Sequence, residues 1–420
     1  MYMEDKMPLA DGYTYSLDSS VTGINNNALI IGGSGCGKTW SIVEPRFLAT
    51  RHGSLITVVS KVRIMRKYAG FFRNRGYKVR VINFANPGQS GCYDPMQYVK
   101  NDVDVFNLAE TIVMADSRKQ YSTADPYFDN AAESLLAGLI GLVREMEDPC
   151  FAKVLDLLDG LKIKEDGSAI KTNLDLLFSR LKAEEPESSA LAYWQTFRVN
   201  PFKTAANIIS TLKACTDKIF TSQIREMMGR GWSVDFTEAG KRKTVLFVVV
   251  DAVHSEQHTL VNMFYNTAIQ ELFNYAENMP DGRLPVPVSI IWDDFAVGAR
   301  MEAFPQYISI FREKGISATL LLQSLSQLRS MYGNSAAVTI VNNCDTQVYM
   351  GGMDLDTADE ISRRVNRPLE DILYMPVGKL VIMRRGTLPV FAGRYNLSRD
   401  PLYQKVTKDY ESQITGLKEK

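Results

Sequence analysis

Gly32-Gly33-Ser34-Gly35-Cys36-Gly37-Lys38-Thr39 is the stretch that decides the fold, because its spacing matches a phosphate-binding P-loop. Glycines let the backbone turn so that several N–H groups face one anion, and a following helix directs its positive end at the same point. In this pattern Lys38 is expected to reach the β- and γ-phosphates of ATP, and Thr39 to ligate Mg²⁺. The residues predicted to bind the nucleotide are Gly33, Ser34, Gly35, Cys36, Gly37, Lys38 and Thr39.

Apolar, β-branched runs bounded by turn residues surround this loop and alternate with segments of helical periodicity. The alternation predicts an α/β fold with a mainly parallel central sheet. Strands are expected at residues 28–31, 55–59, 79–84, 245–250, 286–292, 318–322, 348–350 and 380–383.

The pattern changes to helical periodicity between residues 101 and 231, where strand-like alternation is nearly absent. We therefore predict an all-α domain at 101–231, inserted into a discontinuous nucleotide-binding domain of residues 1–100 and 232–420. The polar stretches 162–168 and 184–189 are predicted to be exposed loops.

A second acidic motif, Val288-Ser289-Ile290-Ile291-Trp292-Asp293-Asp294, has the Walker B form of an apolar strand ending in acids. A P-loop needs a carboxylate to hold its metal, and Asp293 would serve in the Mg²⁺ shell. Asp294 would orient or deprotonate the attacking water. The alternative is a strand that simply ends in two solvated acids.

Two later residues complete the predicted catalytic set of Lys38, Asp293, Asp294, Arg312 and Gln323. Arg312 is either a surface charge or an arginine finger that stabilises the phosphoryl group bound by a neighbouring subunit. Gln323 is either a polar turn residue or a sensor of the γ-phosphate, at the sheet edge where ligands bind in α/β folds.

Bulk composition excludes some classes of protein. The 48 basic and 48 acidic residues balance, so no global positive field attracts nucleic acid. Five cysteines without a Cys-x-x-Cys pair fit a reducing cytoplasm, and three histidines leave little material for a Cys/His metal site. No signal peptide is visible, and the longest apolar stretch, near 135–143, is shorter than the roughly 20 residues of a membrane helix.

In their order along the chain these motifs resemble the TraG-like type IV secretion coupling proteins, which are hexameric ATPases related to the FtsK and HerA translocases. The P-loop and Asp293-Asp294-Phe295-Ala296 match the family's Walker motifs. The other matching segments are Asp125-Pro126-Tyr127-Phe128 with Ala131, Ala132, Glu133, Leu135 and Leu136, then Arg312-x-x-Gly315-Ile316, Gln323-Ser324-x-x-Gln327-Leu328, Tyr332-Gly333, Asn342-Asn343-Cys344 and Thr357-Ala358-x-x-Ile361-Ser362.

The resemblance implies a RecA-like P-loop NTPase domain and an ATPase with ATP and Mg²⁺ as cofactors. It implies that Arg312 is the arginine finger of a homo-hexamer and that Gln323 senses phosphate. The implied partners are relaxase-bound single-stranded DNA (or double-stranded DNA), a relaxosome or effector protein, and a secretion-channel or membrane subunit. The implied location is the cytoplasm, peripheral to the cytoplasmic face of the membrane.

Three departures from the family pattern qualify this expectation. About 30 residues precede the P-loop and none of them spans a membrane, whereas family members usually carry N-terminal membrane helices. The usual Asp-Pro-Lys-Gly-Glu stretch is here Val59-Ser60-Lys61-Val62-Arg63. The usual Walker B glutamate is Asp294, which is one methylene shorter, and a displacement of about 1 Å can cost about a hundredfold in rate.

These departures leave a second hypothesis open: a nucleotide-switched recruitment factor of the same family with little turnover. A different ring motor, for DNA packaging or segregation, is a third, which the helical insert opposes. Basic candidates for DNA contact in the helical region are Arg198, Lys203, Lys213 and Lys218. A solvated helix face explains them equally well.

Overall fold

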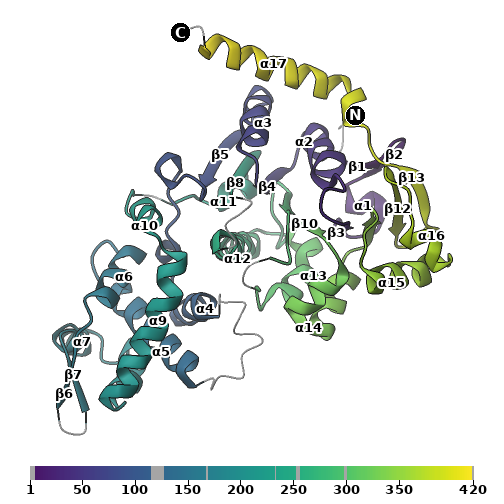
Figure 1. Cartoon of the computed structure of the whole chain (residues 1–420). Helices are drawn as coiled ribbons and strands as arrows, with labels where there is room; N and C mark the ends of the chain where they lie inside the picture. Colours follow the sequence, from purple (N-terminus) through teal and green to yellow (C-terminus); the bar gives the residue numbers. More distant parts are fainter. Residues whose placement is uncertain are drawn as a thin grey trace. The chain divides into compact units, whose positions relative to one another are not determined.

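The computed structural model describes residues 5–114, 127–166, 169–231, 233–251, 256–297 and 300–418. They form two compact units. The first, here the sheet unit, contains residues up to 81, 236–250 and 269 onward. The second, here the helical unit, contains residues 82–235 and 251–268. Figure 1 labels the elements of both.

A nine-stranded sheet dominates the sheet unit, in the order β13-β12-β11-β3-β10-β9-β4-β8-β5. The neighbours from β11 to β8 pair in parallel, and β12 and β13 add an antiparallel edge. The α/β expectation is therefore confirmed. The strands are β3 (Ala28–Ile31), β4 (Ser54–Val59), β5 (Lys78–Asn83), β8 (Thr244–Val249), β9 (Val288–Trp292), β10 (Ile316–Leu322), β11 (Thr346–Tyr349), β12 (Lys379–Arg384) and β13 (Val390–Gly393).

Helices connect these strands, as parallel pairing requires. An antiparallel pair, β1 (Lys6–Ala10) and β2 (Tyr13–Ser16), precedes the first parallel strand. The helices of this part of the chain are α1 (Ser19–Thr22), the π-helix η1 (Thr39–Val43), α2 (Glu44–Ala49), α3 (Val62–Asn74), α11 (Thr237–Lys241), α12 (Glu256–Glu277), α13 (Phe304–Lys314), α14 (Leu325–Asn342), α15 (Leu355–Val365), α16 (Leu369–Leu373) and α17 (Pro401–Lys418).

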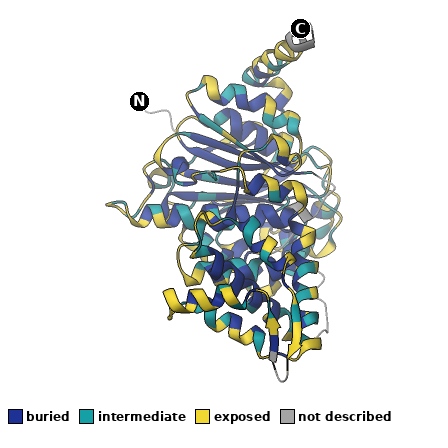
Figure 2. Ribbon diagram, turned by 90° about the vertical axis from the view of Figure 1, so that its left-hand side faces the viewer, coloured by how far each residue is buried: buried dark blue, intermediate teal, exposed yellow. Residues whose placement is uncertain are grey.

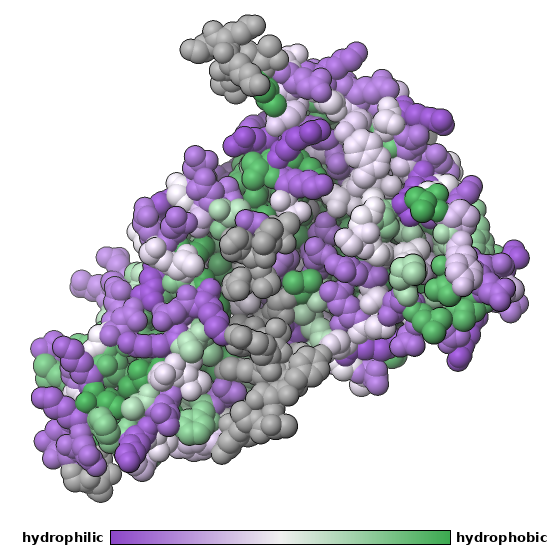
Figure 3. All heavy atoms as spheres, viewed as in Figure 1, coloured by the Kyte–Doolittle hydropathy of each residue, from purple (hydrophilic) through white to green (hydrophobic). Residues whose placement is uncertain are grey.

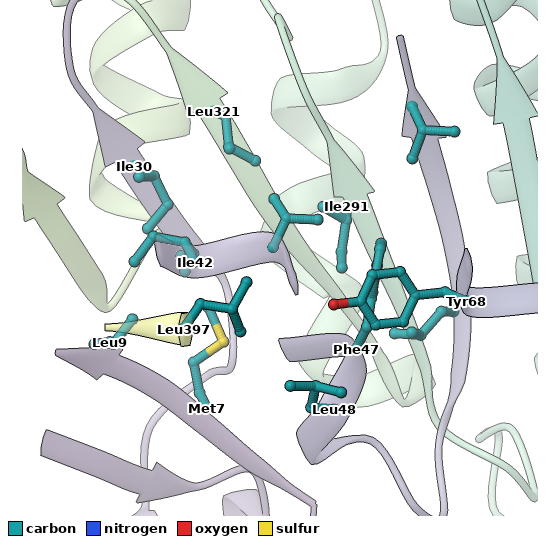
Figure 4. Close-up of a cluster of buried hydrophobic side chains, with 14 of the residues drawn as sticks. Met7, Leu9, Ile30, Ile42, Phe47, Leu48, Tyr68, Ile291, Leu321 and Leu397 are labelled. Carbon is teal, nitrogen blue, oxygen red and sulfur yellow. The ribbon is translucent and has the colours of Figure 1, made fainter. Parts of the chain in front are cut away.

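The core of the sheet unit lies where β3, β9 and β10 meet the helices that follow the P-loop. Figure 4 shows Ile42 and Phe47 from those helices packed near Ile30, Ile291 and Leu321 from the strands. All are at most 1% exposed, and Figure 2 shows the sheet as dark, buried strands. Burial on both faces explains why these strands read as continuous apolar runs in the sequence.

A buried ion pair ties α2 to α3. Lys67 Nζ lies 2.5 Å from Glu44 Oε2, and the Tyr68 hydroxyl donates to the same oxygen at 2.9 Å. Burial and the Glu44 charge raise the pKa of Tyr68. Lys67 Nζ also lies 4.3 Å from the centre of the Tyr403 ring, so α17 covers the pair. The helix that begins at the P-loop is thereby anchored to two other helices.

The helical unit contains mainly helices, in agreement with the sequence pattern. Its helices are α4 (Asp102–Val113), α5 (Tyr127–Arg144), α6 (Phe151–Asp159), α7 (Asp175–Glu184), α8 (Ser189–Arg198), α9 (Phe202–Ile219), α10 (Ser222–Met228) and the first part of α12, up to residue 268. The short 3-10 turns η2 (Pro87–Gln89) and η3 (Pro95–Tyr98) precede them.

One expectation for the helical unit is wrong. Residues 162–168 were predicted as an exposed loop. Residues 167 and 168 lie outside the described residues, but β6 (Ile163–Asp166) pairs antiparallel with β7 (Ala169–Thr172). Three of the four β6 side chains are exposed, so the strand lacks the apolar alternation that would predict it. No helix in the described ranges is both long enough and apolar enough to cross a lipid bilayer.

Candidate functional site

The P-loop leaves the carboxyl end of β3 and is held by both neighbouring strands. Gly32 N donates to Leu322 O at the end of β10 (3.0 Å), and Gly33 N donates to Gly351 O just beyond β11 (3.0 Å). A side chain at Gly32 would bring its Cβ to 2.6 Å from Cys36 Sγ, so the loop closes tightly on itself. The half-buried Cys36 is one of the free cysteines.

Positive φ values of 72° at Gly35 and 84° at Gly37 make the turn that glycine permits and side chains oppose. Within the described chain, the N–H groups of Ser34, Gly35 and Gly37 have no hydrogen-bond acceptor. Lys38 is 8% exposed, and its Nζ donates to Gly32 O at 2.6 Å. Ser41 N donates to Gly37 O, so the helix begins directly behind the loop. The loop therefore offers several N–H donors that are open to an anion, next to the Lys38 ammonium.

Asp293 lies immediately after β9, and its Oδ2 accepts the Thr39 hydroxyl at 3.0 Å. A hydroxyl and a carboxylate are ligand types that Mg²⁺ takes in nucleotide sites. Burial, and then the adjacent Asp294 charge, raise the pKa of Asp293, while Thr39 and Lys38 oppose the shift. A dication would offset the cost of keeping this carboxylate ionised, so the residues present fit a metal.

Asp294 has a left-handed backbone conformation, with φ of 54°. Aspartate tolerates this region better than most residues, but it still stores strain, and such strain often marks functional positions. The conformation turns the chain sharply behind β9, where Phe295 N donates back to Leu321 O at 3.1 Å. Both acids therefore stay at the end of the sheet.

Gln323 follows β10, the strand that lies between the P-loop strand and the strand that carries Asp293. Its side chain is exposed, and its backbone N–H donates to Gln327 Oε1 at 3.3 Å. The preceding residue, Leu322, accepts the hydrogen bond from Gly32. The structure therefore brings Gln323 to the same edge as Lys38, Thr39 and Asp293.

Arg312 lies at the other end of the parallel strands, where they begin. It occupies the last turn of α13, and Gly315 ends this helix before β10 begins. Its exposed side chain faces a cavity of about 270 Å³, which Arg46, Arg283, Ser289 and Ser317 also line. Among the described residues, the Arg312 guanidinium donates to Ser19 O alone, at 3.4 Å. Of the predicted catalytic residues, Arg312 alone is not brought to the P-loop of its own chain.

The sequence pattern did not single out Arg394, which contacts the P-loop directly. Its Nη1 donates to Cys36 O, and its Nη2 donates to Met350 O at 2.9 Å. Arg394 lies 358 residues from Cys36 along the chain. No local spacing could have indicated this contact.

Two of the basic candidates for DNA contact pair with acids of the helical unit. Arg198 Nε lies 3.1 Å from Asp175 Oδ1, and Lys213 Nζ lies 3.9 Å from Asp159 Oδ1. Lys203 is exposed on α9. Asp125 and Pro126 of the expected Asp-Pro-Tyr-Phe motif lie outside the described residues, and α5 begins at Tyr127.

Comparison with known proteins places the chain among proteins of conjugation. The family described as Type IV secretory system Conjugative DNA transfer matches residues 4–367. The chain is 19% identical over 326 residues to the coupling protein TraD of Escherichia coli (strain K12), and 21% identical over 353 residues to the conjugal transfer protein TraG of Rhizobium radiobacter. These matches cover 77% and 81% of this chain but 41% and 52% of those proteins, so the chain spans about half the length of the curated relatives it matches.

Solved structures share the fold. The bacterial conjugative coupling protein TrwBdeltaN70 superposes with a TM-score of 0.67 at 14% identity, covering 94% of this chain and 88% of that one. TrwB in complex with the non-hydrolysable ATP analogue ADPNP gives 0.65 at 15% identity, with 90% and 87% covered. VirB4 of Thermoanaerobacter pseudethanolicus gives 0.57 at 12%, with 96% and 98% covered. With the family match over residues 4–367, the chain belongs to the type IV secretory system conjugative DNA transfer family.

Proposed function

We propose that this chain is an ATPase that binds ATP with Mg²⁺ and uses it to recruit and move DNA or protein toward a secretion channel. The main support for this proposal is that the P-loop N–H groups, Lys38 and the Thr39–Asp293 pair lie together where the parallel strands end. Solved structures of the neighbour TrwB contain ADPNP in one case and ADP with Mg²⁺ in another, which supports these ligands.

Each residue at this edge has a chemical role in the proposal. Lys38 would leave the Gly32 carbonyl to bind the β- and γ-phosphates. Thr39 and Asp293 would hold Mg²⁺, which would supply positive charge beside the phosphates. Asp294 orients or deprotonates the attacking water, and Gln323 contacts the γ-phosphate or that water. These contacts bind and orient the triphosphate. Arg394, the arginine described at the P-loop, is engaged with the carbonyls of Cys36 and Met350, so the proposal assigns the transferring group to another arginine.

We infer that a second copy of the chain supplies this arginine, Arg312, in a ring, and a homo-hexamer is the proposed assembly. Figure 3 shows hydrophobic residues gathered at the edge where Figure 1 places α15 and α16. Met353 and Val377, which flank these helices, are 93% and 95% exposed. Exposed apolar side chains next to a P-loop site support association through the surface at α15 and α16.

The proposed cargo is relaxase-bound single-stranded DNA, with double-stranded DNA or an effector protein as the other possible cargoes of such a motor. A relaxosome protein and a membrane or channel subunit are the proposed partners, at the cytoplasmic face of the membrane. The family membership and the relatives named TraD and TraG support this assignment.

The test compares ATP hydrolysis by the wild type and by Lys38→Ala, with and without single-stranded DNA. The motor proposal expects DNA-stimulated turnover in the wild type, and Lys38→Ala should abolish it because the phosphates lose their cation. ATP binding without turnover, at any DNA concentration, would favour the nucleotide-switched recruitment factor instead. If the wild type does not bind ATP, both functions are wrong.

A further inference from the structure

Arg394 contacts the P-loop from a part of the chain that is distant in sequence. It follows β13, and its backbone N–H donates to Gly378 O at 2.8 Å, which fixes the start of the side chain. The guanidinium then donates through Nη1 to Cys36 O in the P-loop and through Nη2 to Met350 O beyond β11. One side chain therefore joins the loop to the end of a neighbouring strand.

The contact with Cys36 O determines where the next N–H group points. A peptide unit is planar and trans, so the Cys36 carbonyl and the Gly37 N–H point in opposite directions. With the carbonyl directed at Arg394, the Gly37 N–H faces away from Arg394. This N–H has no acceptor within the described residues, and Gly37 has the φ of 84° that places it in the turn.

The contact with Met350 O fixes the position of the loop. Gly33 N donates to Gly351 O, so the start of the P-loop is already tied to the chain that follows β11. Arg394 adds a second tie at Cys36, three residues later, to the residue before Gly351. A planar guanidinium can donate to two carbonyls from fixed positions, whereas a lysine ammonium is a point charge on a flexible stem.

We propose that Arg394 is a positioning residue for nucleotide binding, which presets the Gly37 N–H as a donor to the β-phosphate of a nucleoside di- or triphosphate. The proposal rests on the proposed function, since it requires nucleotide in the P-loop. P-loop N–H groups enclose the α- and β-phosphates, so a misdirected Gly37 peptide lowers affinity for ADP and ATP. AMP has no β-phosphate, and its affinity is unaffected.

The test measures equilibrium binding of ADP and AMP to the wild type, Arg394→Lys and Arg394→Met. Hydrogen bonds to charged groups correspond to roughly ten- to hundredfold in affinity, so both variants should bind ADP at least about tenfold more weakly. The affinity for AMP should stay unchanged. Lysine keeps the charge but not the two-carbonyl geometry, so it should not restore binding.

Arg75→Lys is the matched control. Arg75 Nη1 also donates to two backbone carbonyls of the sheet unit, Leu48 O at 3.1 Å and Thr50 O at 3.2 Å, away from the P-loop. This variant should bind ADP like the wild type, and thermal melting of all variants reports loss of fold.

Three outcomes would overturn the proposal. Normal ADP binding by Arg394→Lys would show that charge alone suffices. An equal loss of ADP and AMP affinity, or an equal effect of Arg75→Lys, would indicate a general structural role. If the wild type binds no nucleotide, the proposed function fails first and this inference with it.

Discussion

The two ends of the parallel strands differ in how their charged groups are held. Where the parallel strands end, Lys38 and Asp293 are engaged with the P-loop and Thr39, and Arg394 braces the loop from outside. Where the strands begin, Arg312 is exposed beside a cavity, and within the described part of the chain its guanidinium has one long hydrogen bond, to Ser19 O. The first end gathers donors and a carboxylate of the kinds that bind a phosphate and its metal ion, and the second presents a cation outward.

This difference supports the proposal that one chain carries two halves of a site, which a neighbouring copy completes. β9 contains five residues, which at about 3.3 Å each separate its ends by roughly 17 Å. Arg312 and the P-loop lie at opposite ends of such strands, too far apart for one side chain to connect. A second copy that presents its strand-start edge to this P-loop would complete the site.

Arg312→Ala should have the largest effect on the rate of ATP hydrolysis. Hydrolysis should fall about a thousandfold, the lower range for loss of an arginine finger, while ATP affinity stays near that of the wild type. Steady-state ATPase assays with parallel binding measurements check this. Arg73→Ala, which removes an exposed arginine in the last turn of α3, is the control and should change neither quantity.

Mixing variants tests whether Arg312 acts between subunits. Lys38→Ala lacks the nucleotide site but keeps Arg312, and Arg312→Ala has the reverse defect. If Arg312 acts on a neighbour, a mixture of the two inactive variants should recover part of the activity. A mixture as inactive as its components, although it assembles, would show that Arg312 serves only its own chain.

Asp294→Glu should change the turnover of ATP by a smaller factor. The longer side chain moves the carboxylate toward the attacking water, and turnover should rise, by up to about a hundredfold. Glutamate suits a φ of 54° less well than aspartate does, so thermal stability should fall slightly. Unchanged turnover in a folded variant would mean that Asp294 already reaches the water, or that hydrolysis does not depend on it.

Asp293 should give the smallest effect, a pH dependence of stability without nucleotide. Its pKa is raised mainly by burial, so the folded state holds this proton to higher pH than the unfolded state does. The associated stability is present below the ordinary aspartate pKa, about 3.9, and is lost as pH rises through the raised value.

Asp293→Asn removes this dependence. The melting temperature of the nucleotide-free variant should exceed that of the wild type by a few degrees at neutral pH, with the difference disappearing as pH falls. The exposed Asp281→Asn is the control and should show neither change. A variant that melts below the wild type at pH 7 would show that the Thr39 contact outweighs the cost of burial.

The parts of the site that depend on local sequence could be predicted. The P-loop and the acids after β9 are each a strand followed directly by functional residues, so spacing alone indicates them. The order of strands, with β10 between β3 and β9, depends on tertiary pairing and could not be predicted. The same holds for Arg394, which reaches Cys36 from 358 residues away, and for the left-handed conformation of Asp294.

The cysteine inside the P-loop allows nucleotide binding to be followed by thiol labelling. Cys36 is half-buried and free, and its carbonyl is the one that Arg394 holds. Alkylation there would add bulk where phosphates are expected to bind, so thiol reagents should inactivate the protein, and bound nucleotide should slow the labelling. Cys215 and Cys344 are buried, which leaves Cys92 and Cys150 as the competing sites to replace. Oxidation during preparation would likewise lower the fraction of protein that can bind ligand, independently of folding.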